Sequence, residues 1–223
     1  MALAHGPSIV TSGLVLALDA ANINSYPGSG TTWTDLSGQG AHGTINGSVA
    51  YVSAGNASYF NWPAAASTNY VSSTVSQNYL DMTIVFQPDF TLSSNASLAG
   101  LIAISNDTTT SDKSLRFGGA NGTGPWTLQN PDNTDGWASS ATTFYVNGTS
   151  GATQLVSGWN ILGGTRTNVT SFPANFSYFL GTEGYSTVRD FRGKIAAVFM
   201  YNRSLTASEQ QQNFNALRGR YNI

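Results

Sequence analysis

The sequence predicts an all-β fold in which two antiparallel sheets pack face to face, with one short C-terminal helix. Short segments of alternating apolar and polar residues recur along the chain, each bounded by Gly, Asn or Pro, as in strands with one buried face. The chain contains no repeat, heptad pattern, long helical segment or alternation of strands with helices. Its 223 residues, 40% hydrophobic and 12% aromatic, provide enough apolar surface for one large sandwich domain.

The N-terminal dozen residues are predicted to form an arm that lies outside the core. Residues 1–12 make up this arm and residues 13–223 the single folded domain. The first residues lack the basic segment of a signal peptide, and the apolar run that follows the arm is short and closed by Asp19. We therefore expect the protein to be synthesised in the cytoplasm and not to insert into a membrane.

The strands are expected in turn-bounded segments of similar length. They are residues 44–51, 57–62, 70–73, 80–86, 98–104, 114–117, 142–146, 153–162, 175–181 and 191–201. In residues 80–86 and 191–201 alternate positions are apolar, which predicts one inward-facing side. Asn147-Gly148 predicts a tight hairpin, because both residues tolerate positive φ.

A helix is predicted to follow the last strand. Thr206 and Glu209 have the spacing of a capping box, in which each side chain bonds to the backbone N–H of the other residue. The sequence after them is polar and ends at Tyr221-Asn-Ile. A closing strand is therefore expected to lead directly into a surface helix.

The two ends of the chain resemble a known superfamily. The closing strand and helix, with the N-terminal blocks at residues 13–22 and 26–38, resemble concanavalin A-like lectin/glucanase domains, in particular the laminin-G-like jelly rolls. The Tyr-Val-Asn-Gly hairpin that ends at Gly148 and the later Gly-Trp-Asn that contains Trp159 resemble the same pattern. The matching motifs lie near both ends of the chain, so the resemblance extends over its whole length. It implies a two-sheet antiparallel jelly-roll sandwich.

Composition argues against several classes of partner. Charged residues make up 9% of the chain and the net charge is −2, so no basic surface for nucleic acid or anionic lipid is expected. The absence of cysteine excludes disulfides and cysteine-based zinc sites.

Residues suited to catalysis are not grouped in the sequence. Glucanases of this fold are expected to carry two carboxylates in one short motif, because retaining hydrolysis requires an acid and a nucleophile about 5 Å apart. This chain has two glutamates in different elements, and Glu209 is explained by the capping box. Asp132 and Asp135 are close, but they lie in a Pro/Asn/Gly loop where aspartate makes turns. The protein is therefore predicted not to be an enzyme.

The segment 118–137 is the candidate recognition loop. Its side chains suit a sugar, because an aromatic ring packs on the C–H face of a pyranose while amides and carboxylates bind hydroxyls. The predicted glycan-binding residues are Trp126, Asn130, Asp132, Asp135 and Trp137. The alternative is that the tryptophans pack on the sandwich and the polar residues cap turns. Calcium binds in this superfamily, but the spacing of the loop's oxygen ligands fits no specific calcium loop, so no cofactor is predicted.

A second candidate surface combines the arm with a basic edge near the closing strand. Its predicted interface residues are Arg189, Arg192, Lys194, His5 and Pro7. Solvated charges on a strand edge explain the basic residues equally well.

The motifs at residues 18–22, 26–38 and 201–206 resemble the version of this domain found in virion proteins of tailed phages and other viruses of aquatic microbes. The resemblance implies a non-catalytic virion surface protein, a capsid decoration or a tail or fibre component. Such a protein would be made in the host cytoplasm and would dock on other virion proteins, with homo-oligomers as one form of assembly. The loops at the end opposite the docking surface would be free to contact host glycans. The alternatives are a free carbohydrate-binding lectin or adhesin and, less favoured, a divergent glycoside hydrolase.

Overall fold

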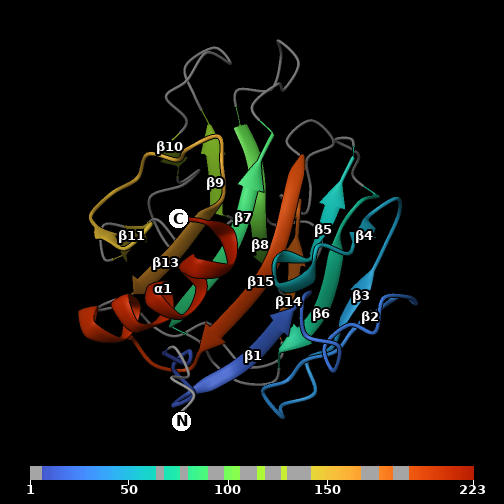
Figure 1. The fold of residues 1–223 in the computed structure, drawn as a ribbon, viewed down its shortest axis with the longest axis horizontal. Helices are drawn as coiled ribbons and strands as arrows, with labels where there is room; N and C mark the ends of the chain where they lie inside the picture. Colours follow the sequence, from blue (N-terminus) through green and yellow to red (C-terminus); the bar gives the residue numbers. More distant parts are fainter. Residues whose placement is uncertain are drawn as a thin grey trace, which may run out of the picture.

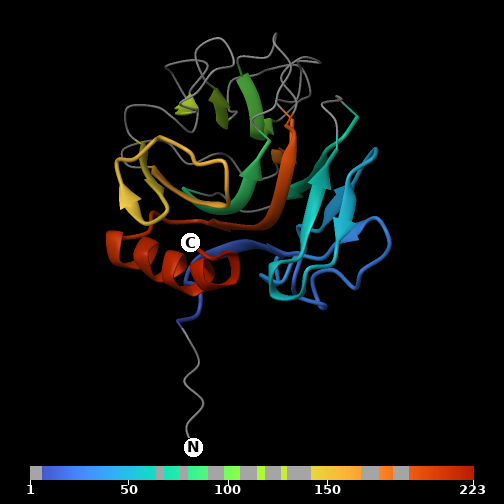
Figure 2. The same ribbon diagram turned by 45° about the horizontal axis from the view of Figure 1, so that its top comes forward.

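The computed structural model describes residues 7–63, 68–75, 80–89, 98–105, 115–118, 127–129, 142–166, 176–182 and 191–223. Within these ranges two antiparallel sheets pack face to face, and a C-terminal helix lies outside one of them (Figures 1 and 2). The predicted two-sheet sandwich with one C-terminal helix is confirmed. Within the same ranges, no helix has the length and apolar character needed to cross a membrane.

The first sheet, sheet A, has eight strands in the described residues, in the order β12-β11-β13-β7-β15-β5-β4, with β1 added on β15. Its strands are β1 (Leu14–Asp19), β4 (Ala50–Val52), β5 (Tyr59–Trp62), β7 (Asp81–Pro88), β11 (Thr142–Val146), β12 (Thr149–Ser150), β13 (Asn160–Arg166) and β15 (Gly193–Tyr201). A 3-10 turn, η1 (Gly55–Ala57), joins β4 to β5.

The second sheet, sheet B, has seven strands in the described residues, in the order β10-β9-β8-β14-β6-β3-β2. Its strands are β2 (Thr32–Trp33), β3 (Gly43–Ile45), β6 (Val71–Val75), β8 (Leu98–Ser105), β9 (Leu115–Gly118), β10 (Thr127–Gln129) and β14 (Phe176–Leu180). The helix is α1 (Ala207–Tyr221).

Strand β15 organises sheet A because three strands pair with it. Along one edge β7 pairs with it from Gly193 to Tyr201. Along the other edge, its first residues pair with β5 and its last ones, from Ala197, pair with β1. A register shift between Ile195 and Ala197 marks the change of partner. The start of β15 and the start of β1 therefore lie at opposite ends of the sandwich (Figure 1).

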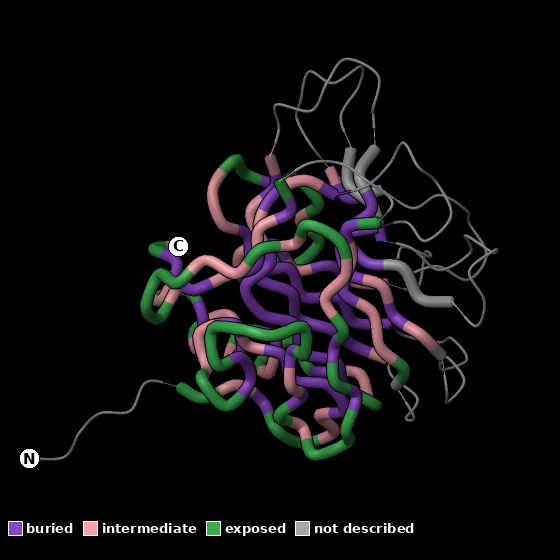
Figure 3. The backbone as a smooth tube through the Cα atoms, turned by 90° about the vertical axis from the view of Figure 1, so that its right-hand side faces the viewer, coloured by how far each residue is buried: buried purple, intermediate pink, exposed green. Residues whose placement is uncertain are grey.

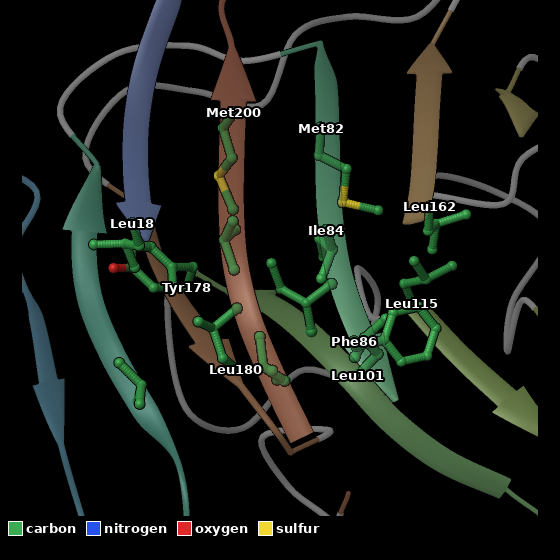
Figure 4. Close-up of a cluster of buried hydrophobic side chains, with 14 of the residues drawn as sticks. Leu18, Met82, Ile84, Phe86, Leu101, Leu115, Leu162, Tyr178, Leu180 and Met200 are labelled. Carbon is green, nitrogen blue, oxygen red and sulfur yellow. The ribbon is translucent and has the colours of Figure 1, made fainter. Parts of the chain in front are cut away.

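The main core fills the space between the sheets. Met82, Ile84 and Phe86 of β7 project from sheet A and meet side chains from sheet B, among them Leu101 and Leu115 (Figure 4). Most buried residues lie in the strands and most exposed ones in the connections, and Figure 3 shows the burial of each residue along the chain. The alternation predicted for residues 80–86 is thus confirmed for its inward face.

The prediction of a single buried face was wrong for both β7 and β15. Val85 and Phe199 point away from the main core, yet they are buried in a second cluster beneath α1, together with Leu217 and Tyr221 of the helix. The helix shields the outer face of sheet A from water, so both faces of these central strands are buried there.

Three boundaries also differ from prediction. Residues 44–51 form two strands, β3 and β4, in different sheets, because Gly47, with a φ of 69°, turns the chain between them. The strand expected at 153–162 begins only at Asn160. Residues 127–129, inside the predicted recognition loop, form β10, which pairs with β9.

Candidate functional site

The predicted glycan-binding residues lie outside the part of the chain that the structure describes. They are Trp126, Asn130, Asp132, Asp135 and Trp137, and their role stays a prediction. Of the predicted interface, His5 and Arg189 also lie outside the described residues. Pro7, Arg192 and Lys194 are described, and the structure places them in two different regions.

A hollow of about 550 Å³ lies where β5 and β7 end and β15 begins. This is the upper end of sheet A in Figure 1. Its lining residues are Asn61, Trp62, Pro63, Gln87, Pro88, Asp89, Ser157, Gly193 and Lys194. We call it the β15 hollow. Its amides, hydroxyl, amine and carboxylate provide both hydrogen-bond donors and acceptors.

Lys194 joins this hollow to two aromatic rings. Its Nζ donates a hydrogen bond of 3.0 Å to Oε1 of Gln87. The same nitrogen lies 4.9 Å from the centre of the Tyr59 ring and 5.9 Å from that of Trp159. A cation within about 6 Å of an aromatic centroid is attracted to its face. The amine is therefore held between the hollow and the rings.

The two rings form the start of an aromatic row beside the helix. Tyr59 and Trp159 meet edge to face with centroids 5.7 Å apart, and Trp159 packs on Tyr221 of α1 at 4.8 Å. Tyr221 is buried, whereas Tyr59 and Trp159 are half-buried. The outer face of sheet A thus presents two partly accessible rings next to the β15 hollow.

The segment that carries Ser157 and Trp159 is fixed by the buried Asn160. Oδ1 of Asn160 accepts from the N–H of Val156 at 3.0 Å, and Nδ2 donates to the carbonyls of Val156 and Gly158. Nε2 of Gln87 adds a bond of 3.1 Å to the Ser157 carbonyl. Val156 in this segment is left 50% exposed. The segment is thus ordered by side-chain hydrogen bonds, which lowers the entropy cost of binding a ligand beside it.

The other described carboxylates outside the hollow have structural roles. Asp19 forms two hydrogen bonds with the Arg220 guanidinium, at 2.7 and 2.8 Å. Asp35 accepts from the N–H groups of Ala17, Ser37 and Ala41 and so shapes the turn after β2.

Glu209 has the predicted capping role. It pairs with Arg203, and it completes the predicted capping box with Thr206. Its hydrogen bonds from Arg203 and Thr206 lower the pKa of Glu209 to about 2.

Asp81 is a fully buried carboxyl beneath α1. It accepts from the Thr165 hydroxyl, from the N–H of Leu205 at 2.9 Å and from Nε2 of Gln210. Burial raises the pKa of Asp81 to about 7, and these hydrogen bonds oppose part of that rise. The group joins β7, β13 and the helix, and the helix covers it, so we assign it to helix docking.

Metal ligands are not grouped in the described ranges, where no three His, Cys, Asp or Glu side chains lie close enough to hold an ion. His42, the histidine within the described ranges, accepts a hydrogen bond at Nδ1 from the N–H of Asp35.

The described end of the arm packs on the helix instead of lying entirely outside the core. Val10 is buried, and its N–H donates to Oδ1 of Asn213 at 2.8 Å. The Ser8 carbonyl accepts from Nε2 of Gln212. Pro7 lines a separate hollow between η1 and α1, so the structure does not bring it together with Arg192 and Lys194.

Sequence reasoning did not select Tyr59, Gln87 and Trp159 as candidate site residues, although one signal was present. In β5, Phe60 and Trp62 are buried in the core, so Tyr59 and Asn61 face outward. An aromatic residue on the polar face of a strand indicates a partly exposed ring. Which other residues join that ring depends on the pairing of β5, β15 and β7, which the sequence does not show.

Comparison with known proteins gives structural similarity at low sequence identity. No family model matches the chain, and no curated protein sequence matches it. The chain is similar to Trypanosoma rangeli sialidase in complex with the inhibitor DANA, with 14% identity and a TM-score of 0.56 over 93% of this chain and 33% of the sialidase.

A second similar structure is a single domain of comparable size. It is domain 4 of AbnA, a GH43 extracellular arabinanase from Geobacillus stearothermophilus, in complex with arabinotriose. Identity is 18%, coverage is 92% of this chain and 98% of that domain, and the TM-score is 0.52. The chain spans about a third of the sialidase chains it matches. At these identities the likeness concerns the fold alone, which is a two-sheet antiparallel β-sandwich.

Proposed function

We propose that this chain is a non-catalytic carbohydrate-binding β-sandwich whose β15 hollow, with the rings of Tyr59 and Trp159, binds a saccharide. The observation that carries the proposal is the placement of two half-buried rings beside a hollow of about 550 Å³ that is lined by both apolar and polar side chains. Aromatic faces pack on the C–H surface of a sugar, and a few converging polar groups fix its orientation. A similar domain was solved with arabinotriose bound, which supports this ligand class.

The proposal that the module does not catalyse hydrolysis rests on the carboxylates. Asp89 is the one carboxylate that lines the β15 hollow among the described residues. Glycoside hydrolysis uses two, about 5 to 10 Å apart. Asp19, Asp35, Asp81 and Glu209 are each used in the hydrogen bonding of the fold.

We place the module on a virion surface, docked on capsid or tail proteins after synthesis in the host cytoplasm. The motifs at residues 18–22, 26–38 and 201–206 support this setting. The structure is compatible with it geometrically, because β1 starts at the end of the sandwich opposite the β15 hollow. An attachment near the arm would leave the hollow facing outward. Homo-oligomers on the particle are part of this proposal, and nucleic acid is not among the proposed partners.

A glycan array tests the carbohydrate proposal. We expect the purified protein to be retained by a subset of glycans and Trp159→Ala to lose most of that retention. Tyr51→Ala is the matched control, because Tyr51 is a half-buried aromatic of the neighbouring strand β4 that lines a different hollow. Retention that survives Trp159→Ala but is lost in Trp126→Ala or Trp137→Ala would move the site to the segment 118–137.

Rebinding to stripped virions tests the setting independently. Ordered rebinding of the purified protein to particles that lack it would support the virion role. Glycan retention without binding to any particle would instead support the alternative, a free lectin or adhesin.

A further inference from the structure

Two charged side chains line the β15 hollow, and their surroundings differ. Oδ2 of Asp89 lies 3.7 Å from Nη2 of Arg192, so a neighbouring cation balances its charge. Lys194 contacts an amide oxygen of Gln87 and two aromatic rings, which carry no net charge. In the described ranges, no carboxylate lies within ion-pair distance of Lys194. The hollow therefore carries an excess positive charge at Lys194.

The geometry of Lys194 leaves the ammonium able to bind a ligand. An ammonium has three N–H donors, and one is directed to Gln87. The side chain is half-buried against Tyr59 and Trp159, so its amine is restricted in position. Hydrogen bonds from a cation to an anion are roughly twice as strong as those between neutral groups. An anionic group on the ligand would satisfy the charge that the protein leaves unpaired.

We propose that the β15 hollow selects a saccharide that carries a carboxylate or sulfate group, and that Lys194 binds this group. The inference rests on the proposed function, because it assigns the ligand class of the same site. Tyr59 and Trp159 would pack against the sugar ring, while Gln87 holds the amine in place.

A panel of matched oligosaccharides tests the proposal. Galactotriose, cellotriose and mannotriose are printed beside their uronate and 6-O-sulfated counterparts, and affinities are measured at low and high salt. We expect the protein to bind at least one acidic form about tenfold more tightly than its neutral form, with the preference reduced by salt. Comparing the uronate with the sulfated form shows which anion the site prefers.

Three variants separate the role of Lys194 from changes in net charge or folding. Lys194→Gln is expected to abolish the acidic preference, measured as the ratio of the affinities for the acidic and neutral forms, and Lys194→Arg to retain most of it. Arg218→Gln removes the same charge from an exposed position on α1 and is expected to leave the preference unchanged.

The outcomes distinguish this inference from the proposed function. Equal binding of acidic and neutral forms, or a preference that persists in Lys194→Gln, would overturn the anionic ligand class and leave the carbohydrate site standing. Retention of no saccharide in the panel or on the wider array would overturn both.

Discussion

Asp81 shows how a single side chain fastens the helix to the sandwich. Its carboxyl is fully buried and receives hydrogen bonds from β13, from the backbone before α1 and from Gln210 within α1. Removing this carboxyl would leave several buried donors without an acceptor. Each unsatisfied donor lowers the free energy of unfolding by about 1 to 3 kcal/mol. Neighbouring Asn213 extends the same layer through bonds to Thr83 and Tyr201. The outer face of sheet A is thus joined to the helix by polar as well as apolar contacts.

Asp81 predicts an unusual pH dependence of stability. Its pKa rises from 3.8 to about 7 on folding, so the folded chain retains a proton that the unfolded chain has released. The free energy of unfolding should therefore fall as the pH rises from about 4 to about 7. Urea unfolding of the wild type and of Asp81→Asn across this range measures the effect. The variant should lack most of this slope, and an equal slope in both proteins would show that Asp81 does not cause it.

Tyr59 and Lys194 show which contacts of single residues the sequence could not predict. Lys194 was expected at a docking interface because it lies in a basic run of the closing strand. The structure places it between an amide from β7 and rings from β5 and the segment before β13. These segments are up to about 135 residues apart in sequence, and only strand pairing brings them together.

At the scale of elements, the helix and the β11–β12 hairpin depend on each other. The hairpin turn at Asn147 and Gly148, predicted from the Asn-Gly dipeptide, has positive φ at both residues. Oδ1 of Asn147 accepts from the N–H of Ile161, which ties the turn to β13. A Cβ built on Gly148 would lie 2.8 Å from the ring of Phe214 in α1. The helix can therefore approach the hairpin only where a side chain is missing.

Gly148→Ala should destabilise the protein more than a matched glycine change. Gly151→Ala is the control, because Gly151 also has positive φ but its Cβ would meet no atom within 4 Å. We expect a loss of about 1 kcal/mol at Gly151 from backbone strain, and a further 1 to 3 kcal/mol at Gly148 from the steric clash with Phe214. Thermal or urea unfolding of both variants measures the difference. Equal losses would mean that Phe214 adjusts without cost.

The elements that the sequence predicted correctly are those with local signals. The capping box of Thr206 and Glu209 and the Asn-Gly turn each act within a few residues, and both are present. The segment before β13 was predicted as strand from residue 153, but Asn160 bonds back to Val156 and Gly158 and holds it as a loop. The burial of both faces of β15 depends on α1, which packs there only in the folded molecule.

At the scale of the whole molecule, the fold was predictable because composition, turn spacing and the two terminal motifs all favour the same sandwich. The site was less predictable. Sequence reasoning chose the segment 118–137, where aromatic and polar residues are neighbours along the chain. That prediction stays untested, because its residues lie outside the described part of the chain. The β15 hollow is a second candidate, which gathers residues from the end of β5, the end of β7, the segment before β13 and the start of β15.

The sandwich also separates two ends that the proposed function uses differently. Residues near the arm pack against α1, and β1 begins beside the last residue of β15. The β15 hollow lies beside the first residue of that strand, eight residues and roughly 25 Å of extended chain away. A module attached near the arm can therefore present the hollow to a ligand in solution or on a cell.

The most direct test of the carbohydrate site is to map binding on the ¹⁵N-labelled protein by NMR, using the oligosaccharide that the array retains most strongly. The account predicts chemical-shift changes concentrated at the backbone of Gln87, Ser157 and Lys194 and at the indole N–H of Trp159. Changes confined to residues 118–137, or shifts that leave the Trp159 indole and Lys194 unaffected at saturation, would contradict a carbohydrate site at the β15 hollow.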